Sequence, residues 1–132
     1  MIVADTNLIV YLFITGDQTS LAQKVLEKDP HWIVPLLWQS EFRNVLAAYI
    51  RRGMTLPRAK EIMDNAFQTL EHRQINPSFE IILDLIAESD CTAYDCEFVA
   101  LARQLSIQLV TADRQLLKAF PDCAISLEEF TK

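Results

Sequence analysis

Short apolar runs separated by polar breaks predict buried strands that alternate with helices. The opening run from Ile2 to Ala4 has no polar alternation, which is typical of a parallel strand covered on both faces. Three later runs predict further strands, at Trp32 to Pro35, Ile107 to Val110 and Ala124 to Ser126. With a shorter candidate at Gln74 to Asn76, the pattern predicts an α/β fold with a central parallel sheet of four to five strands.

A helical hairpin is predicted in the middle of the chain. Between Leu36 and Arg52 the apolar residues recur at helical spacing, at Phe42, Val45, Leu46, Tyr49 and Ile50. Gly53 ends this helix, and a second one with Pro57 in its first turn runs from about Leu56 to Leu70.

Shorter helices are predicted between the strands. The apolar spacing and the capping and breaking residues predict a helix or turn from Leu8 to Phe13 and a helix capped by Thr19 or Ser20 and ended by Asp29-Pro30. Pro77 starts a further helix that runs through Ile86. Two more are predicted, one from Ala93 to Leu105 capped by Thr92 and a short one with Leu116 and Leu117. The segment from Ala93 to Leu105 is apolar almost all round, so we expect it to be buried.

The composition is that of one compact domain. Apolar residues form 51% of the 132 residues and charged residues 23%, with two Gly and five Pro, which excludes disordered and collagen-like classes. A chain of this length buries about two thirds of its unfolded surface, so we expect a single domain over residues 1–132. No apolar stretch approaches the roughly 18 residues of a membrane span, and no basic segment precedes the first apolar run. We therefore expect a cytoplasmic protein with no membrane partner.

Residues that would indicate several other chemistries are missing. Cys91, Cys96 and Cys123 are odd in number and form no CxxC pair, so we expect free thiols. His31 and His72 have no third partner and are interpreted as structural or surface residues. There is no GxSxG, P-loop, GxGxxG or HExxH motif, so the serine-hydrolase, NTPase, dinucleotide-binding and zincin classes lack support.

Four acidic residues occupy comparable places in the predicted elements. Asp5 and Asp113 directly follow buried strands, Asp95 lies in the first turn of a buried helix, and Glu41 lies in the early turns of another. In a right-handed βαβ fold, strand carboxyl ends and helix amino ends lie on the same edge of the sheet. Open α/β sheets bind their ligands at that edge, so we expect the four carboxylates to converge there.

Converging carboxylates repel one another and need compensation. A hard divalent cation, Mg²⁺ or Mn²⁺, supplies it and also activates bound water, so the chemistry implied is phosphodiester hydrolysis. The formal net charge of -6 argues against a nucleic-acid partner. Committing four of the 18 acidic residues to a metal leaves 14 against 12 basic ones, which largely removes that objection.

Each acid also has a structural interpretation. Asp5 could cap a helix, and Asp95 could favour the positive end of one. Glu41 could pair with Arg43 or Arg52, and Asp113 could be an ordinary turn residue. Periodicity and spacing alone leave these alternatives open.

The segments around the four acids resemble the four motifs of the PIN-domain family, in order. They read IVADTNLIVYL, WQSEFRNVL, YDCEFVALA and LVTADRQLL. Within that family the chain is similar to the toxin ribonucleases of VapBC-type toxin-antitoxin pairs, and the resemblance spans nearly the whole chain. It implies a three-layer α/β/α fold with a parallel sheet.

The resemblance also implies an activity and its residues. The activity is cleavage of single-stranded RNA, dependent on Mg²⁺ or Mn²⁺, with the catalytic and metal-binding residues Asp5, Glu41, Asp95 and Asp113. Supporting polar residues are Thr6, Asn7 and Thr111. Candidates for phosphate contact are the basic residues Arg43, Arg51, Arg52 and Arg114. The implied partners are a small antitoxin protein and a second copy of the chain in a homodimer.

Two other functions stay open. A PIN domain could bind RNA or a protein without cutting, although the complete acidic quartet argues against this. A haloacid-dehalogenase-like phosphatase would use Asp5 as a nucleophile, but Asn7 stands where that family has a second Asp, and no Lys precedes the later acidic pair.

Overall fold

The computed structural model describes residues 1–132 and contains a four-stranded, wholly parallel sheet. The strand order is β2-β1-β3-β4, with β1 at Ile2–Ala4, β2 at Trp32–Ile33, β3 at Leu109–Val110 and β4 at Ala124–Ile125. The α/β class and the parallel sheet are confirmed. In place of the fifth candidate strand, Gln74 forms one isolated parallel bridge with Val34.

The central position of β1 explains its uninterrupted apolar sequence. Val3 pairs with Ile33 on one side and with Leu109 on the other, and all three residues of β1 are buried. Ala4 pairs with Val110, so the residues that follow these two strands lie next to each other. The register therefore brings Asp5 beside Thr111 at the carboxyl edge of the sheet.

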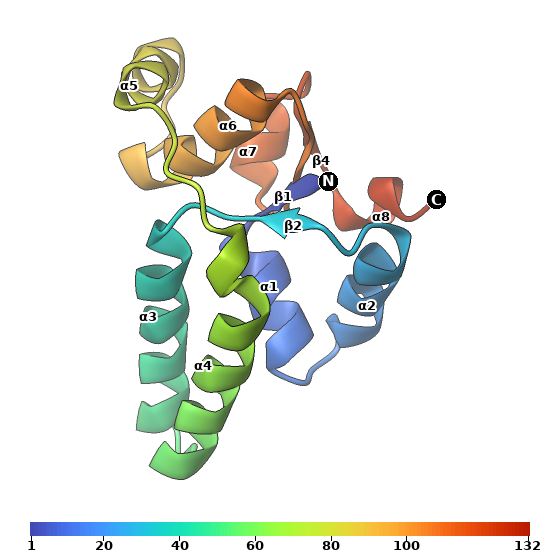
Figure 1. The fold of residues 1–132 in the computed structure, drawn as a ribbon, viewed down its shortest axis with the longest axis vertical. Helices are drawn as coiled ribbons and strands as arrows, with labels where there is room; N and C mark the ends of the chain where they lie inside the picture. Colours follow the sequence, from blue (N-terminus) through green and yellow to red (C-terminus); the bar gives the residue numbers. More distant parts are fainter.

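Helices cover both faces of the sheet, as Figure 1 shows. Below β2 in that view lie α1 (Thr6–Phe13), α2 (Thr19–Lys28), α3 (Leu37–Arg51) and α4 (Leu56–Leu70); above it lie α5 (Phe79–Glu88), α6 (Ala93–Leu105) and α7 (Arg114–Ala119). A 3₁₀ turn (Glu71–Arg73) follows α4, and α8 (Leu127–Phe130) ends the chain. The arrangement is the three-layer α/β/α fold that the sequence resemblance implied.

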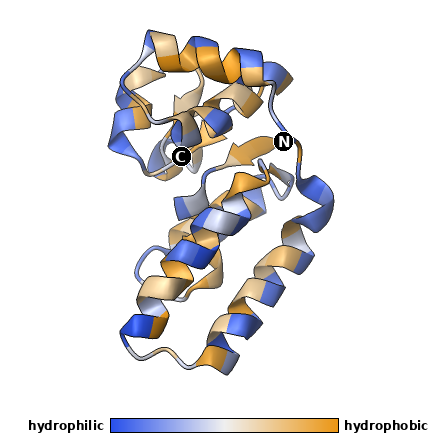
Figure 2. Cartoon of the chain, turned by 90° about the vertical axis from the view of Figure 1, so that its left-hand side faces the viewer, coloured by the Kyte–Doolittle hydropathy of each residue, from blue (hydrophilic) through white to orange (hydrophobic).

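The predicted helical hairpin is formed by α3 and α4, which extend side by side away from the sheet (Figures 1 and 2). Thr55 caps α4 by accepting a hydrogen bond from the Arg58 amide. Between the helices Gly53 has φ +112°, a conformation that side chains with a Cβ rarely adopt. Gly53 thus ends the first helix, as the sequence predicted.

Several local predictions were wrong. The residue that precedes α2 is Gln18, not Thr19 or Ser20, because the Thr19 hydroxyl instead donates to the Tyr11 carbonyl (2.7 Å). The strand expected from Ile107 begins two residues later, since the Ile107 amide closes the end of α6 by donating to the Ala102 carbonyl. The final helix α8 was not predicted.

The cysteines are free thiols, as expected, with Cys91 and Cys96 buried and Cys123 half-buried. Both histidines are exposed. None of the helices combines the length and apolar character that crossing a membrane requires.

Candidate active site

The four predicted acids line one pocket of about 700 Å³ at the carboxyl edge of the sheet. Asp5 follows β1 and is the N-cap residue of α1, and Asp113 follows β3 and is the N-cap residue of α7. Asp95 lies in the first turn of α6, and Glu41 lies in the second turn of α3. Four elements that are distant in sequence therefore each contribute one carboxylate to the same pocket.

Asp5 is fixed by hydrogen bonds to both of its carboxylate oxygens. Its Oδ1 accepts from the Thr6 amide at 2.8 Å, and its Oδ2 accepts from the Thr111 hydroxyl at 2.5 Å and from the Asn7 amide group at 3.1 Å. The Thr6 hydroxyl donates to Oε1 of Glu41 at 2.6 Å. These contacts connect the acids of β1 and α3 through neighbouring polar side chains.

Asn7 and Thr111 also connect the loop after β3 to α1. The Oδ1 of Asn7 accepts from the Ala112 amide at 3.1 Å, and its Nδ2 approaches the Thr111 hydroxyl oxygen at 3.3 Å. The Thr111 oxygen accepts from the Asp113 amide at 3.0 Å. The three polar residues that the sequence resemblance assigned to a supporting position thus lie in one network with Asp5.

Burial and mutual repulsion disfavour the charged forms of the acids. Burial of Asp5, which is 5% exposed, raises its pKa to about 6, and the charges of Glu41 and Asp95 act in the same direction. The pKa of Glu41 is raised by burial and then by Asp95. The pKa of Asp95 is raised by burial and by Asp113. The pocket therefore concentrates negative charge that its own hydrogen bonds only partly offset.

No basic side chain neutralises this charge. None of the ion pairs in the protein involves any of the four acids, so the predicted alternative in which Glu41 pairs with Arg43 or Arg52 is not seen. In this arrangement no three His, Cys, Asp or Glu side chains are placed to hold one metal ion together. The structure thus shows a shared acidic pocket but not a closed coordination shell.

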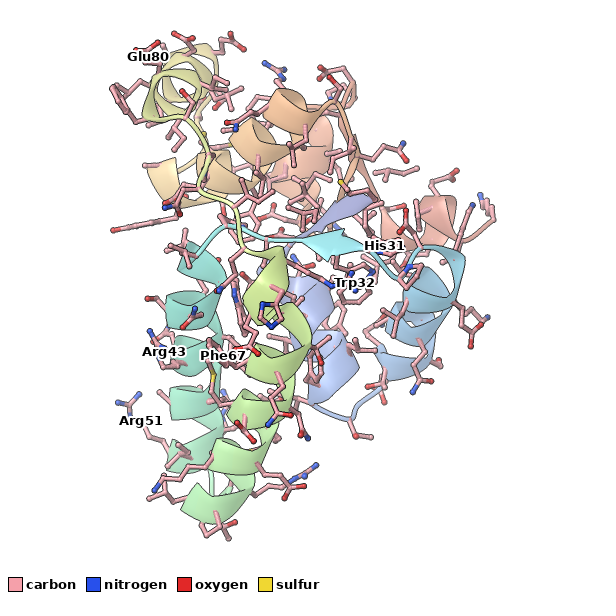
Figure 3. The ribbon with its side chains drawn as sticks, viewed as in Figure 1. His31, Trp32, Arg43, Arg51, Phe67 and Glu80 are labelled. Carbon is pink, nitrogen blue, oxygen red and sulfur yellow. The ribbon has the colours of Figure 1, made fainter.

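The four arginines considered for phosphate contact, Arg43, Arg51, Arg52 and Arg114, are exposed, and none of them lines the pocket. Figure 3 shows Arg43 and Arg51 projecting from the outer side of α3. The structure therefore does not bring these arginines together with the four acids in the pocket.

Part of the pocket lining was missed from the sequence. Seven further residues contribute to it: Val10, Tyr11, Leu37, Ser40, Asn44, Val45 and Tyr94. Most of them lie three or four positions from Asn7 or Glu41 on the same helix and so share a face with it. That spacing was visible in the sequence, but the neighbouring position of α1 and α3 was not.

The comparisons with known proteins agree with this fold. The family model of the PIN domain matches residues 2–120, nearly the whole chain. The chain therefore belongs to the PIN domain family, which confirms the family resemblance seen in the sequence.

Individual relatives extend the match over the full length. Ribonuclease VapC3 of Pyrobaculum aerophilum is 25% identical over 124 residues, which cover 91% of this chain and 95% of that protein. The crystal structure of PAE2754 from Pyrobaculum aerophilum has a TM-score of 0.75 at 21% identity, covering 99% of this chain and 96% of its own. The crystal structure of FitAcB from Neisseria gonorrhoeae has a TM-score of 0.76 at 15% identity, covering 97% and 99%. The chain is thus similar to a VapC ribonuclease in sequence and to both solved structures in fold.

Proposed function

We propose that this protein is a Mg²⁺- or Mn²⁺-dependent endoribonuclease that cleaves single-stranded RNA, and that it is the toxin of a toxin-antitoxin pair. The observation that carries the proposal is the convergence of Asp5, Glu41, Asp95 and Asp113 on one pocket that has no basic residue. Membership of the PIN domain family and similarity to a protein named Ribonuclease VapC3 support it.

The donor atoms of the pocket fit a hard divalent cation. All four acids offer carboxylate oxygens, and Mg²⁺ is typically held by one or two carboxylates together with several waters, without a complete protein cage. The absence of a three-ligand group is compatible with that mode of binding. The residues that would hold the ion are the four acids, and the ion would activate water and offset charge at a phosphodiester.

The chain's own residues position these carboxylates. Thr111 and Asn7 hold Oδ2 of Asp5, while the hydroxyl of Thr6 holds Glu41. These contacts restrict the rotation of two acids that repel each other, and preorganised groups of this kind lower the cost of reaching the reactive geometry. The network also keeps the carboxylates at the pocket, where substrate phosphate can approach.

We also propose the partners that this function implies. The exposed arginines Arg43, Arg51, Arg52 and Arg114 are candidates for contacts to RNA phosphates beyond the pocket. A small antitoxin is proposed as a protein partner. The free thiols favour a reducing compartment, the cytoplasm.

A homodimer is supported by α5, which is hydrophobic along much of its length (Figure 2). Phe79 is 71% exposed and Leu83 60% exposed on this helix. Large apolar side chains gathered on one exposed helix are typical of a protein interface.

A second candidate function is a PIN domain that binds RNA or a protein without cutting it. The specific observation in its favour is the apolar part of the pocket, with Val10, Leu37 and Val45, which holding a metal ion does not require.

The experiment that separates the two candidates is cleavage of a pool of single-stranded and structured RNAs by purified protein in Mg²⁺, in Mn²⁺ and in EDTA. The nuclease proposal predicts cutting of single-stranded RNA in either metal and none in EDTA. Saturable RNA binding without cutting in any metal would contradict the nuclease and support the binding module.

A further inference from the structure

The pocket is larger and less polar than four carboxylates require. Beyond the acids its wall is formed by Val10 and Tyr11 of α1 and by Leu37 and Val45 of α3, with the Asn44 amide among them. Hydrolysis of a phosphodiester at the carboxylates uses none of these side chains. The apolar part of the pocket therefore needs a separate explanation.

Helical spacing places this apolar part directly beside the acids. Tyr11 lies four residues after Asn7 on α1, and Val45 lies four residues after Glu41 on α3, so each is about one turn, or roughly 5 Å, further along its helix. The two helices pack against each other. A ligand that has its phosphate at the acids can thus place a neighbouring group between α1 and α3.

Tyr94 lies at the same pocket from the opposite layer. It directly precedes Asp95 in the first turn of α6, lines the pocket and is 61% exposed. Tyr94 and Asn44 are both exposed at the pocket, so their polar groups are accessible to a ligand.

The geometry points to a nucleobase subsite: the apolar part of the pocket, with Asn44 and Tyr94, takes one unpaired base of an RNA whose adjacent phosphate lies at the carboxylates. This inference rests on the proposed nuclease function and specifies how its substrate is selected. A base is neutral and flat, so it suits an apolar wall beside a negatively charged site better than a second phosphate does. The pocket volume of about 700 Å³ is also in the range of small-molecule sites.

The residue types explain both strand selection and base preference. Aromatic rings such as Tyr11 and Tyr94 stack on the faces of bases, and a base can reach them only when it is unstacked from a duplex. The side-chain amide of Asn44 has a hydrogen-bond donor and a hydrogen-bond acceptor, so it can form hydrogen bonds to the edge of a base. Stacking on the tyrosine rings therefore selects single-stranded RNA. Hydrogen bonds from Asn44 select one nucleotide at the cut site.

The test is an abasic scan of one cleaved single-stranded RNA. Each nucleotide near the cut site is replaced in turn by an abasic residue, and kcat/KM is measured in Mg²⁺. In parallel, fluorescence anisotropy with Ca²⁺ in place of Mg²⁺ measures binding of the same RNAs. The subsite predicts that abasic substitution at one position next to the cut lowers kcat/KM and affinity by about tenfold, while the other positions have little effect.

Two substitutions connect that position to the named residues. Asn44→Ala is expected to relax the preference for one nucleotide at the cut site. Tyr94→Ala is expected to lower kcat/KM and affinity for the intact RNA to the values for the abasic RNA, so that the abasic substitution has no further effect. Tyr94→Phe keeps the ring and is expected to retain most of the affinity. The matched control is Asn65→Ala, an exposed position on α4 outside the pocket, which should leave the abasic profile unchanged.

The outcomes separate the subsite from the nuclease. If the RNA is cleaved and kcat/KM is the same for every abasic position, the subsite is wrong and the nuclease proposal is unaffected. If no RNA is cleaved, the same scan is made by anisotropy on a single-stranded RNA that binds, and a loss of affinity at one position only would overturn the nuclease and keep the subsite. If Asn44→Ala and Tyr94→Ala weakened only the binding of a protein partner and left the abasic profile intact, the apolar part would be a protein-binding surface and the subsite would be wrong.

Discussion

Asp5 shows how one side chain serves the fold and the site at once. Its Oδ1 caps α1 through the Thr6 amide, and its Oδ2 accepts from Thr111 at the pocket. Asp113 repeats the arrangement, since its Oδ1 caps α7 through the amides of Gln115 and Leu116. The capping interpretation of these residues and their place in the pocket are therefore compatible, because the helix cap itself places the carboxylate at the end of a strand.

The raised pKa of Asp5 predicts a pH-dependent cost to the metal-free fold. Its pKa is 3.8 when unperturbed and about 6 in the folded protein, so the cost appears as the pH rises through about 4 and is complete well above pH 6. Replacing Asp5 with Asn removes the ionisation. In EDTA, Asp5→Asn is therefore expected to raise the free energy of unfolding, relative to wild type, by about 2 kcal/mol more at pH 8 than at pH 4.

Urea denaturation of both proteins at the two pH values measures this difference. Any cap or hydrogen bond that Asn forms less well contributes at both pH values and cancels in the comparison. A stability difference that does not change with pH would show that Asp5 is not forced to ionise at a cost. Asp84→Asn, at an exposed position on α5 outside the pocket, is the control.

At the scale of elements, the first turn of α6 positions Asp95. The hydroxyl of Thr92 accepts from the Asp95 amide at 3.1 Å and so caps the helix. Thr92→Ala removes this bond and is expected to lower the free energy of unfolding by about 1 kcal/mol, whereas Thr92→Ser should retain most of it. Thermal denaturation of both variants checks the prediction, and equal losses in Ala and Ser would show that the hydroxyl does not cap the helix.

Local signals in the sequence were sufficient for many of the elements. The helices at Leu56–Leu70 and Ala93–Leu105 have the predicted bounds, because a cap or a proline marks their starts and the apolar pattern continues to their ends. Thr19 was assigned as a possible cap but bonds to the Tyr11 carbonyl, a tertiary contact that no local pattern encodes. Short strands were located by apolar runs, although their bounds depend on partners elsewhere in the chain.

The site was predictable in part for the same reason. The four acids follow strands or begin helices, so the parallel sheet is enough to bring them to one edge. The apolar wall was not predictable, since Tyr11 and Val45 become neighbours only through the packing of α1 against α3. Arg43 shows that nearness in sequence is not sufficient. It is two residues from Glu41 but is exposed and does not line the pocket.

At the scale of the whole molecule, charge is distributed unevenly around the pocket. The net charge is -6, yet the segment from Arg43 to Arg58 contains no acidic residue and four arginines. The hairpin of α3 and α4 carries these arginines away from the acidic pocket (Figure 1). A divalent cation in the pocket would reduce the net charge of -6 by two units. Together with the exposed basic arm, it would weaken the long-range repulsion of RNA.

The most direct test of the account is cleavage of a susceptible single-stranded RNA in Mg²⁺ by wild type, Asp95→Asn and the control Asp84→Asn, each shown to be folded by circular dichroism. Asp95 is chosen because it lines the pocket and makes no ion pair, and because Asn is close to Asp in size and shape. The account predicts that Asp95→Asn loses at least a hundredfold in kcat, while Asp84→Asn keeps the wild-type rate. Undiminished cleavage by Asp95→Asn would contradict a catalytic role for the shared carboxylate pocket.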